Sequence, residues 1–115
     1  MAVEVRTSEL NANVKIVQLS GRLDMATAEA DSPIVMQALE ESAAGVICDL
    51  SGIAFISSAG LRILIAASKR VQAADKQLAL ISVPPGVYKI FKIASLDPLF
   101  HFFKSEAEAV EALWS

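Results

Sequence analysis

Two adjacent serines, Ser57 and Ser58, stand between a strand-like apolar segment and the clearest helical pattern of the chain, at residues 57–74. The first backbone N–H groups of a helix are unpaired and its dipole is positive there, so this position favours negative charge. One serine can cap the helix. The other is then expected to expose its hydroxyl, where a phosphate would add about 1.5 to 2 negative charges without unfolding the helix. Such a site can change its surface charge while the domain stays folded.

Residues suited to catalysis are scarce. The only histidine, His101, lies in an aromatic run and is expected to be structural or at the surface. The sequence contains no G-x-S-x-G elbow, no P-loop and no G-x-G-x-x-G pattern. The only cysteine, Cys48, lies in an apolar run, where a buried and inert thiol is expected. Acidic pairs such as Glu40 and Glu41 are expected on solvated helix faces. We therefore expect no enzymatic activity, no cofactor and no metal site.

The composition favours one soluble domain, expected to span residues 1–115. Of the 115 residues, 54% are hydrophobic and 20% are charged, which is too apolar for a disordered chain. The net charge of −3 and the lack of a basic stripe argue against nucleic acid and anionic membrane as partners. We see no secretion signal, and no apolar run reaches the roughly 18 residues of a membrane span. We therefore expect a cytoplasmic protein.

Alternating strand and helix patterns predict an α/β fold with a mixed sheet. Two antiparallel strands, at residues 3–5 and 14–19, are expected to open the fold. Gly21 is expected to interrupt the second strand, and Pro33 is expected to break the helix of residues 27–43 into two pieces. Further strands are expected at 46–50, 76–82 and 100–103, and further helices at 57–74, at 86–94 and after Ser105.

The helix at 57–74 has more apolar surface than one packing face requires. Leu61, Leu64 and Ile65 form one stripe at roughly 100° per residue, whereas Ile63 and Ala66 lie outside it. Either this helix is buried on two sides or part of its surface contacts a partner protein.

Three ordered segments, which together extend over most of the chain, resemble the motifs of one family. Residues 19–24 read LSGRLD, residues 49–61 read DLSGIAFISSAGL, and residues 82–91 with 94–100 form a third region. Together they resemble the STAS domain family, and within it the bacterial anti-sigma factor antagonists of the SpoIIAA type. This resemblance implies a sheet of about five strands with helices packed mainly on one side.

The resemblance also implies a partner switch. In such a switch, the unphosphorylated antagonist binds an anti-sigma factor that is a serine kinase, and the sigma factor is released. The kinase then phosphorylates the antagonist, the complex separates, and a PP2C-type phosphatase restores the active form. By position, Ser58 is the phosphoacceptor. The implied partner-binding surface comprises Asp24, Ser57, Gly60, Leu61 and Arg62.

The sequence departs from the family pattern on both sides of Ser58. The preceding position, often aspartate in the family, is Ser57, which makes Ser57 a competing acceptor. The following position, often serine or threonine, is Ala59, which removes a second candidate. Pro33 is unusual in the first helix and is expected to alter one edge of the partner surface.

Other functions and states stay open at the level of the sequence. The main alternative is a regulatory or structural STAS subunit of a lipid or solute ABC transport complex. Another is nucleotide binding or weak hydrolysis by the domain itself. Because the apolar helix face could pair with itself, the free chain is expected to be a monomer or a weak homodimer.

Overall fold

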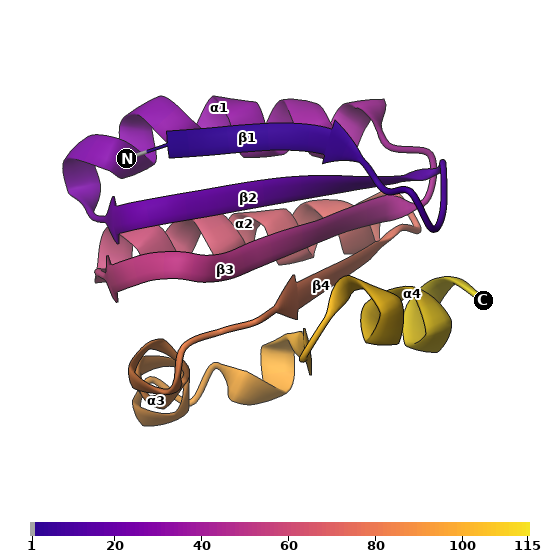
Figure 1. Ribbon diagram of the computed structural model, residues 1–115. Helices are drawn as coiled ribbons and strands as arrows, with labels where there is room; N and C mark the ends of the chain where they lie inside the picture. The colour runs from indigo at the N-terminus through magenta and orange to yellow at the C-terminus, as the bar shows by residue number, and fades with distance from the viewer. Residues whose placement is uncertain (1) are drawn as a thin grey trace.

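The computed structural model describes residues 2–115, which form a five-stranded sheet with helices on both faces (Figure 1). Met1, which the expected domain of residues 1–115 included, lies outside the described residues. The strands are β1 (Ala2–Thr7), β2 (Val14–Leu23), β3 (Gly45–Ile56), β4 (Gln77–Ile81) and β5 (His101–Phe103). The helices are α1 (Met25–Glu41), α2 (Ser58–Ala73), α3 (Pro85–Ile93) and α4 (Glu106–Trp114), with a short 3₁₀ turn at Asp97–Leu99.

The strands lie in the order β1-β2-β3-β4-β5, so neighbours in the chain are neighbours in the sheet. β1 pairs antiparallel with β2, whereas β2, β3, β4 and β5 run parallel to one another. Parallel neighbours need crossover connections, which contain α1, α2 and α3. This arrangement confirms the predicted α/β fold with a mixed sheet.

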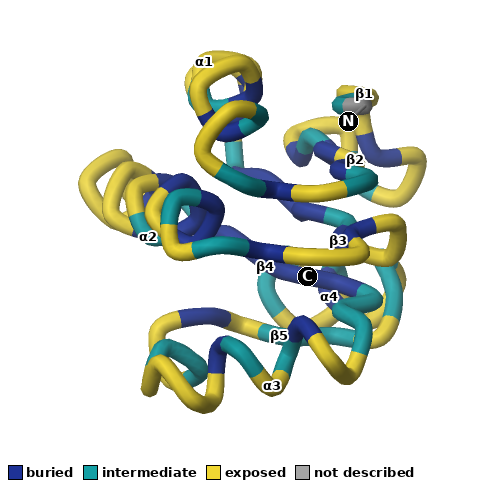
Figure 2. Tube along the Cα trace, turned by 90° about the vertical axis from the view of Figure 1, so that its left-hand side faces the viewer, coloured by how far each residue is buried: buried dark blue, intermediate teal, exposed yellow. Residues whose placement is uncertain are grey.

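Helices α1, α2 and α3 pack on one face of the sheet, and α4 covers part of the other (Figure 2). The main core lies on the first face, where the alternate strand residues Val17, Cys48 and Leu80 join buried side chains of those three helices. A smaller cluster on the second face includes Ile47 and Ala109. Cys48 is buried, as predicted, and this burial raises the pKa of its thiol to about 12.

Helix α1 is continuous, so the predicted break at Pro33 is wrong. The capping box at Asp24 begins the helix: the Asp24 carboxylate accepts a hydrogen bond from the backbone N–H of Thr27, and the Thr27 hydroxyl accepts one from the backbone N–H of Asp24. Because the helix already begins at Asp24, Ser32 and Pro33 lie inside it and not at the start of a second helix. Pro33 lies on the exposed side of the helix, where water can satisfy the carbonyl that its missing N–H leaves unpaired.

Both central strands are longer than predicted. β2 continues past Gly21 because this residue adopts a φ of 87°, and the register with β3 shifts on either side of it. β3 does not end at Leu50 but runs on to Ile56, because Leu23 of β2 still pairs with Ile56. As a result, the carboxyl ends of both strands lie directly before the first residues of α1 and α2.

Candidate functional site

The carboxyl ends of β2 and β3 bring the first two sequence motifs together. The backbone N–H of Ser57 donates a hydrogen bond to the carbonyl oxygen of Leu23, at 2.9 Å. The next residue after Leu23, Asp24, is the N-cap of α1, and Ser57 is the N-cap of α2. Two helices therefore begin from adjacent strand ends (Figure 1), and Asp24 directly follows the residue to which Ser57 is hydrogen-bonded. In parallel sheets, this carboxyl edge is where binding sites usually form.

The two serines have different surroundings. The Ser57 hydroxyl accepts a hydrogen bond from the backbone N–H of Gly60 at 3.3 Å and so caps the helix. Ser58 is the first residue of α2 and is exposed. A phosphate on Ser58 would lie at the positive end of the helix dipole without displacing the capping hydroxyl.

Gly60 and Leu61, expected in the partner surface, are buried. A Cβ added to Gly60 would come within 2.7 Å of the Leu23 carbonyl oxygen and 2.9 Å of the Ile56 side chain. Leu61 is 7% exposed and belongs to the main core. In this structure, both residues therefore hold the start of α2 against the sheet and offer almost no surface to a partner.

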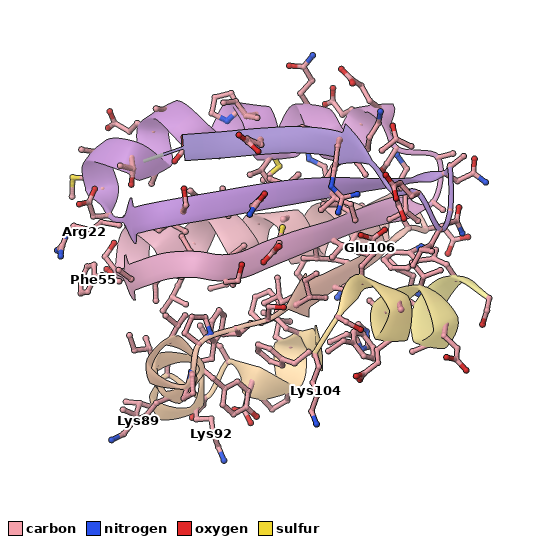
Figure 3. All side chains as sticks on the ribbon, in the orientation of Figure 1. Arg22, Phe55, Lys89, Lys92, Lys104 and Glu106 are labelled. Carbon is pink, nitrogen blue, oxygen red and sulfur yellow. The ribbon has the colours of Figure 1, made fainter. Side chains whose placement is uncertain are left out.

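Asp24 is half-buried and keeps its negative charge. The backbone hydrogen bond from Thr27 lowers the pKa of the Asp24 carboxyl below its ordinary value. Arg22 adds a weak ion pair, with 3.7 Å between its Nε and an Asp24 carboxylate oxygen. The same guanidinium lies over the Phe55 ring, 4.3 Å from the centroid, and Figure 3 shows both side chains at the strand ends. The edge therefore presents a carboxylate, an arginine and a partly exposed aromatic ring.

A shallow groove between α1 and α2 adjoins the start of α2. It has a volume of about 340 Å³ and is lined by Met25, Ala28, Glu29, Ser32, Ala59, Arg62, Ile63 and Ala66. Ile63 is buried in the main core, whereas Ala66 is exposed in this groove. The broad apolar arc of α2 is thus explained partly by burial against its neighbours and partly by an open surface.

Sequence reasoning missed three exposed residues of this region. Met25 is 69% exposed at the first position of α1 and lines the groove. Phe55 and Arg22 meet only because β2 and β3 pair beyond their predicted ends. The sequence does show an aromatic residue, Phe55, two positions before Ser57, but the exposure of its side chain depends on the register of the two strands.

Other residues of chemical interest do not gather at this edge. His101 is exposed on β5, and Cys48 is buried in β3. Within residues 2–115, no group of three or more His, Cys, Asp or Glu side chains is placed to hold a metal ion. No helix in the described part of the chain is long and apolar enough to cross a bilayer.

The sequence pattern of the STAS domain matches residues 5–109, so the chain belongs to the STAS domain family. Among curated relatives, it is 28% identical over 97 residues to BtrV of Bordetella bronchiseptica, a protein assigned to the anti-sigma factor antagonists. This match covers 84% of each chain.

Two solved structures show how widely the fold is used. The Bacillus cell fate determinant SpoIIAA in its phosphorylated form matches with a TM-score of 0.71 at 19% identity, over 96% of this chain and 98% of SpoIIAA. A sulfate transporter family protein from Wolinella succinogenes matches with a TM-score of 0.75 at 16% identity, over 90% of this chain and 86% of that chain. At these identities the likeness concerns the fold alone, so the function has to be argued from the site.

Proposed function

We propose that this chain is an anti-sigma factor antagonist that acts by binding and is controlled by phosphorylation of Ser58. Unmodified, it binds an anti-sigma factor that is a serine kinase, which releases the sigma factor. The observation that carries this proposal is the different use of the two serines. The Ser57 hydroxyl is occupied in capping α2, whereas Ser58 exposes its hydroxyl at the first helical position.

The surface around Ser58 suits a protein partner. Asp24, Met25 and Arg62 are accessible beside it, and the apolar floor of the α1–α2 groove begins at Ala59. Specific interfaces bury about 800 Å² per partner and have an apolar, desolvated centre. In this proposal Gly60 and Leu61 act from beneath the surface, by fixing where Ser57 and Ser58 lie.

Phosphorylation would end binding by electrostatics rather than by unfolding. A phosphate at the centre of an interface must lose its hydration without a compensating partner, and Asp24 nearby adds like charge. Each loss of about 1.4 kcal/mol lowers affinity tenfold. The helix itself tolerates the phosphate, because its unpaired N–H groups and dipole favour an anion at this end. A PP2C-type phosphatase would restore the binding form.

The test is intact-mass analysis after incubation with ATP and an anti-sigma factor serine kinase from the same organism, for wild type, Ser58→Ala and Ser57→Ala. We expect one phosphate on the wild type and on Ser57→Ala, and none on Ser58→Ala. Calorimetry should show that the unmodified chain binds the kinase and that the phosphorylated chain binds at least about tenfold more weakly. Treatment with a PP2C-type phosphatase should restore the original affinity.

Two results would redirect the proposal. Phosphate on Ser58→Ala but not on Ser57→Ala would make Ser57 the acceptor. No phosphate on the wild type, from a kinase that modifies another substrate, would favour a STAS subunit of a transport complex, which shares this fold. Sedimentation of the free chain should show a monomer or a weak homodimer.

A further inference from the structure

A second concave site lies away from Ser58, where β4 and β5 end. It is lined by Val83, Tyr88, Phe102, Phe103, Lys104 and Glu108, and its volume is about 450 Å³. These residues come from the segment after β4, from α3, from β5 and its end, and from α4. The pocket therefore forms at the carboxyl edge of the outer two parallel strands, the edge at which open α/β sheets usually bind ligands.

The aromatic wall of this pocket is held by ring-to-ring packing. Tyr88 meets Phe102 edge-to-face with 5.0 Å between ring centroids. Phe102 in turn packs against the buried Phe91, at 5.4 Å. Because each ring is braced by the next, the apolar wall is preformed, which lowers the entropic cost of filling it.

Three lysines surround this wall. Lys89 and Lys92 lie on α3 and Lys104 lies at the pocket, and Figure 3 shows all three extending away from the sheet on the same side. The Lys92 ammonium is 6.0 Å from the centre of the Tyr88 ring. Among residues 2–115, the three ion pairs within 4.0 Å involve only arginines, so none of these lysines has a carboxylate partner. In a chain of net charge −3, this is a local concentration of unpaired positive charge.

Outside the pocket lining, α3 also exposes a large apolar side chain. Ile93, one turn after Lys89, is 75% exposed. α3 carries no acidic residue, and Glu108 is the one acidic side chain that lines the pocket. Cationic side chains around a concave aromatic surface complement an anionic segment that also carries an apolar side chain.

We propose that this aromatic pocket is a second docking site, which takes an acidic peptide segment of a partner protein with a hydrophobic or aromatic residue as its anchor. The anchor would occupy the space between Tyr88 and Phe103, and flanking carboxylates would pair with Lys92 and Lys104. A concave pocket receives a protruding side chain, whereas a bilayer surface requires protruding apolar residues. The site uses none of the residues proposed for the Ser58 switch, so a partner could occupy it in either phosphorylation state.

The test titrates the isotope-labelled full chain with short peptides in which one Trp, Phe or Leu is flanked by Asp and Glu. We expect the amide resonances of Val83, Tyr88 and Phe102 to shift. Replacing the anchor by alanine, or the acidic residues by lysine, should abolish the shifts. Affinity measured by fluorescence anisotropy should fall at least about tenfold for the double variant Lys92→Glu/Lys104→Glu.

The matched control is Lys69→Glu/Arg70→Glu, which reverses two charges at exposed positions of α2, as many as the test variant does. It should bind the peptides like the wild type, and Lys92→Glu/Lys104→Glu should still accept phosphate on Ser58, so the two proposals fail separately. Equal weakening by Lys69→Glu/Arg70→Glu would reduce the effect to net charge and overturn the docking site. So would the absence of resonance shifts with every peptide. Binding to vesicles of phosphatidylserine and phosphatidylcholine without peptide binding would assign the lysines to a membrane surface instead.

Discussion

Gly60 of α2 lies directly against Leu23 at the end of β2, with no space between them for a side chain. A Cβ on Gly60 would be 2.7 Å from the Leu23 carbonyl oxygen and 2.8 Å from its Cγ. The same carbonyl accepts the backbone hydrogen bond of Ser57. Close packing and this hydrogen bond together fix the start of α2 relative to Asp24, which follows Leu23. The proposed switch thus depends on a contact that lies beneath its surface.

Substituting Gly60 by alanine should destabilise the protein and displace the start of α2. Overpacking of this kind costs about 1–3 kcal/mol, because the opposing atoms include a backbone carbonyl that cannot move away. In a domain of 115 residues, each kcal/mol lowers the Tm by roughly 4 °C. Thermal unfolding followed by circular dichroism measures the change.

Gly86→Ala is the matched control for this prediction. A Cβ at Gly86, in the first turn of α3, would meet no atom within 4 Å. Its stability should stay the same or rise by up to about 1 kcal/mol, since alanine is the better helix residue. Equal loss of stability in the two variants would contradict the packing explanation.

Ser57→Ala should destabilise the protein more than Ser58→Ala does, although only Ser58→Ala should prevent phosphorylation. Ser57 caps α2 through its hydroxyl, and loss of such a cap costs about 0.5–2 kcal/mol. Ser58 is exposed, so its substitution should change the free energy of unfolding by no more than about 0.5 kcal/mol. Urea denaturation at neutral pH distinguishes the two. A larger loss in Ser58→Ala would show that the roles of the serines are reversed.

Asp31 should make the protein less stable as the pH rises. Its side chain is buried in α1, one carboxylate oxygen has no hydrogen-bond partner among residues 2–115, and burial raises the pKa of the carboxyl. The folded state therefore favours the protonated form. Stability relative to Asp31→Asn should fall as the pH increases through the ordinary carboxyl value of about 4 and up to the raised pKa.

The measurement is urea unfolding of wild type and Asp31→Asn at acidic and neutral pH. From acidic to neutral pH, the free energy of unfolding of Asp31→Asn should rise by about 1 kcal/mol relative to that of the wild type, since an unsatisfied buried polar group costs about that much. A difference between the two proteins that does not change with pH would mean that the Asp31 carboxyl titrates alike in the folded and unfolded states.

Glu106 should show the opposite pH dependence. Burial raises the pKa of this carboxyl, but the hydrogen bonds from the Ser8 hydroxyl at 2.6 Å and from the Arg6 guanidinium at 2.8 Å outweigh it, so the pKa is lowered. The folded state therefore favours the carboxylate, and this stabilisation is present above the ordinary pKa and lost as the pH falls through the lowered one.

Glu106→Gln should lower the free energy of unfolding by about 1 kcal/mol at pH 7, because Arg6 is largely exposed and its ion pair is screened. At acidic pH, the difference in the free energy of unfolding between Glu106→Gln and the wild type should disappear. Glu111→Gln, at an exposed position of the same helix, should change stability at neutral pH by less than about 0.5 kcal/mol. A gap that widened at low pH would contradict the assignment.

Local chemistry made much of the fold predictable. The helix that begins at the serine pair and the helix after Ser105 lie where the sequence indicated, because their N-caps, Ser57 and Ser105, act on residues within one turn. Pro33 was misjudged because a proline inside a helix is a local penalty, and the capping box at Asp24 with the packing of Val35 on the sheet overcomes it.

The sequence by itself determined the order of strands and helices, the mixed sheet and the position of the serine pair at a helix start, because these follow from periodicity and capping over short distances. Only the tertiary structure decided that Gly60 and Leu61 are buried, that Arg22 lies on Phe55, and that Tyr88 and Phe102 form a pocket beside unpaired lysines. Each of these depends on the strand register or on contacts between separate elements. Such contacts join residues too far apart in the chain for their spacing to reveal them.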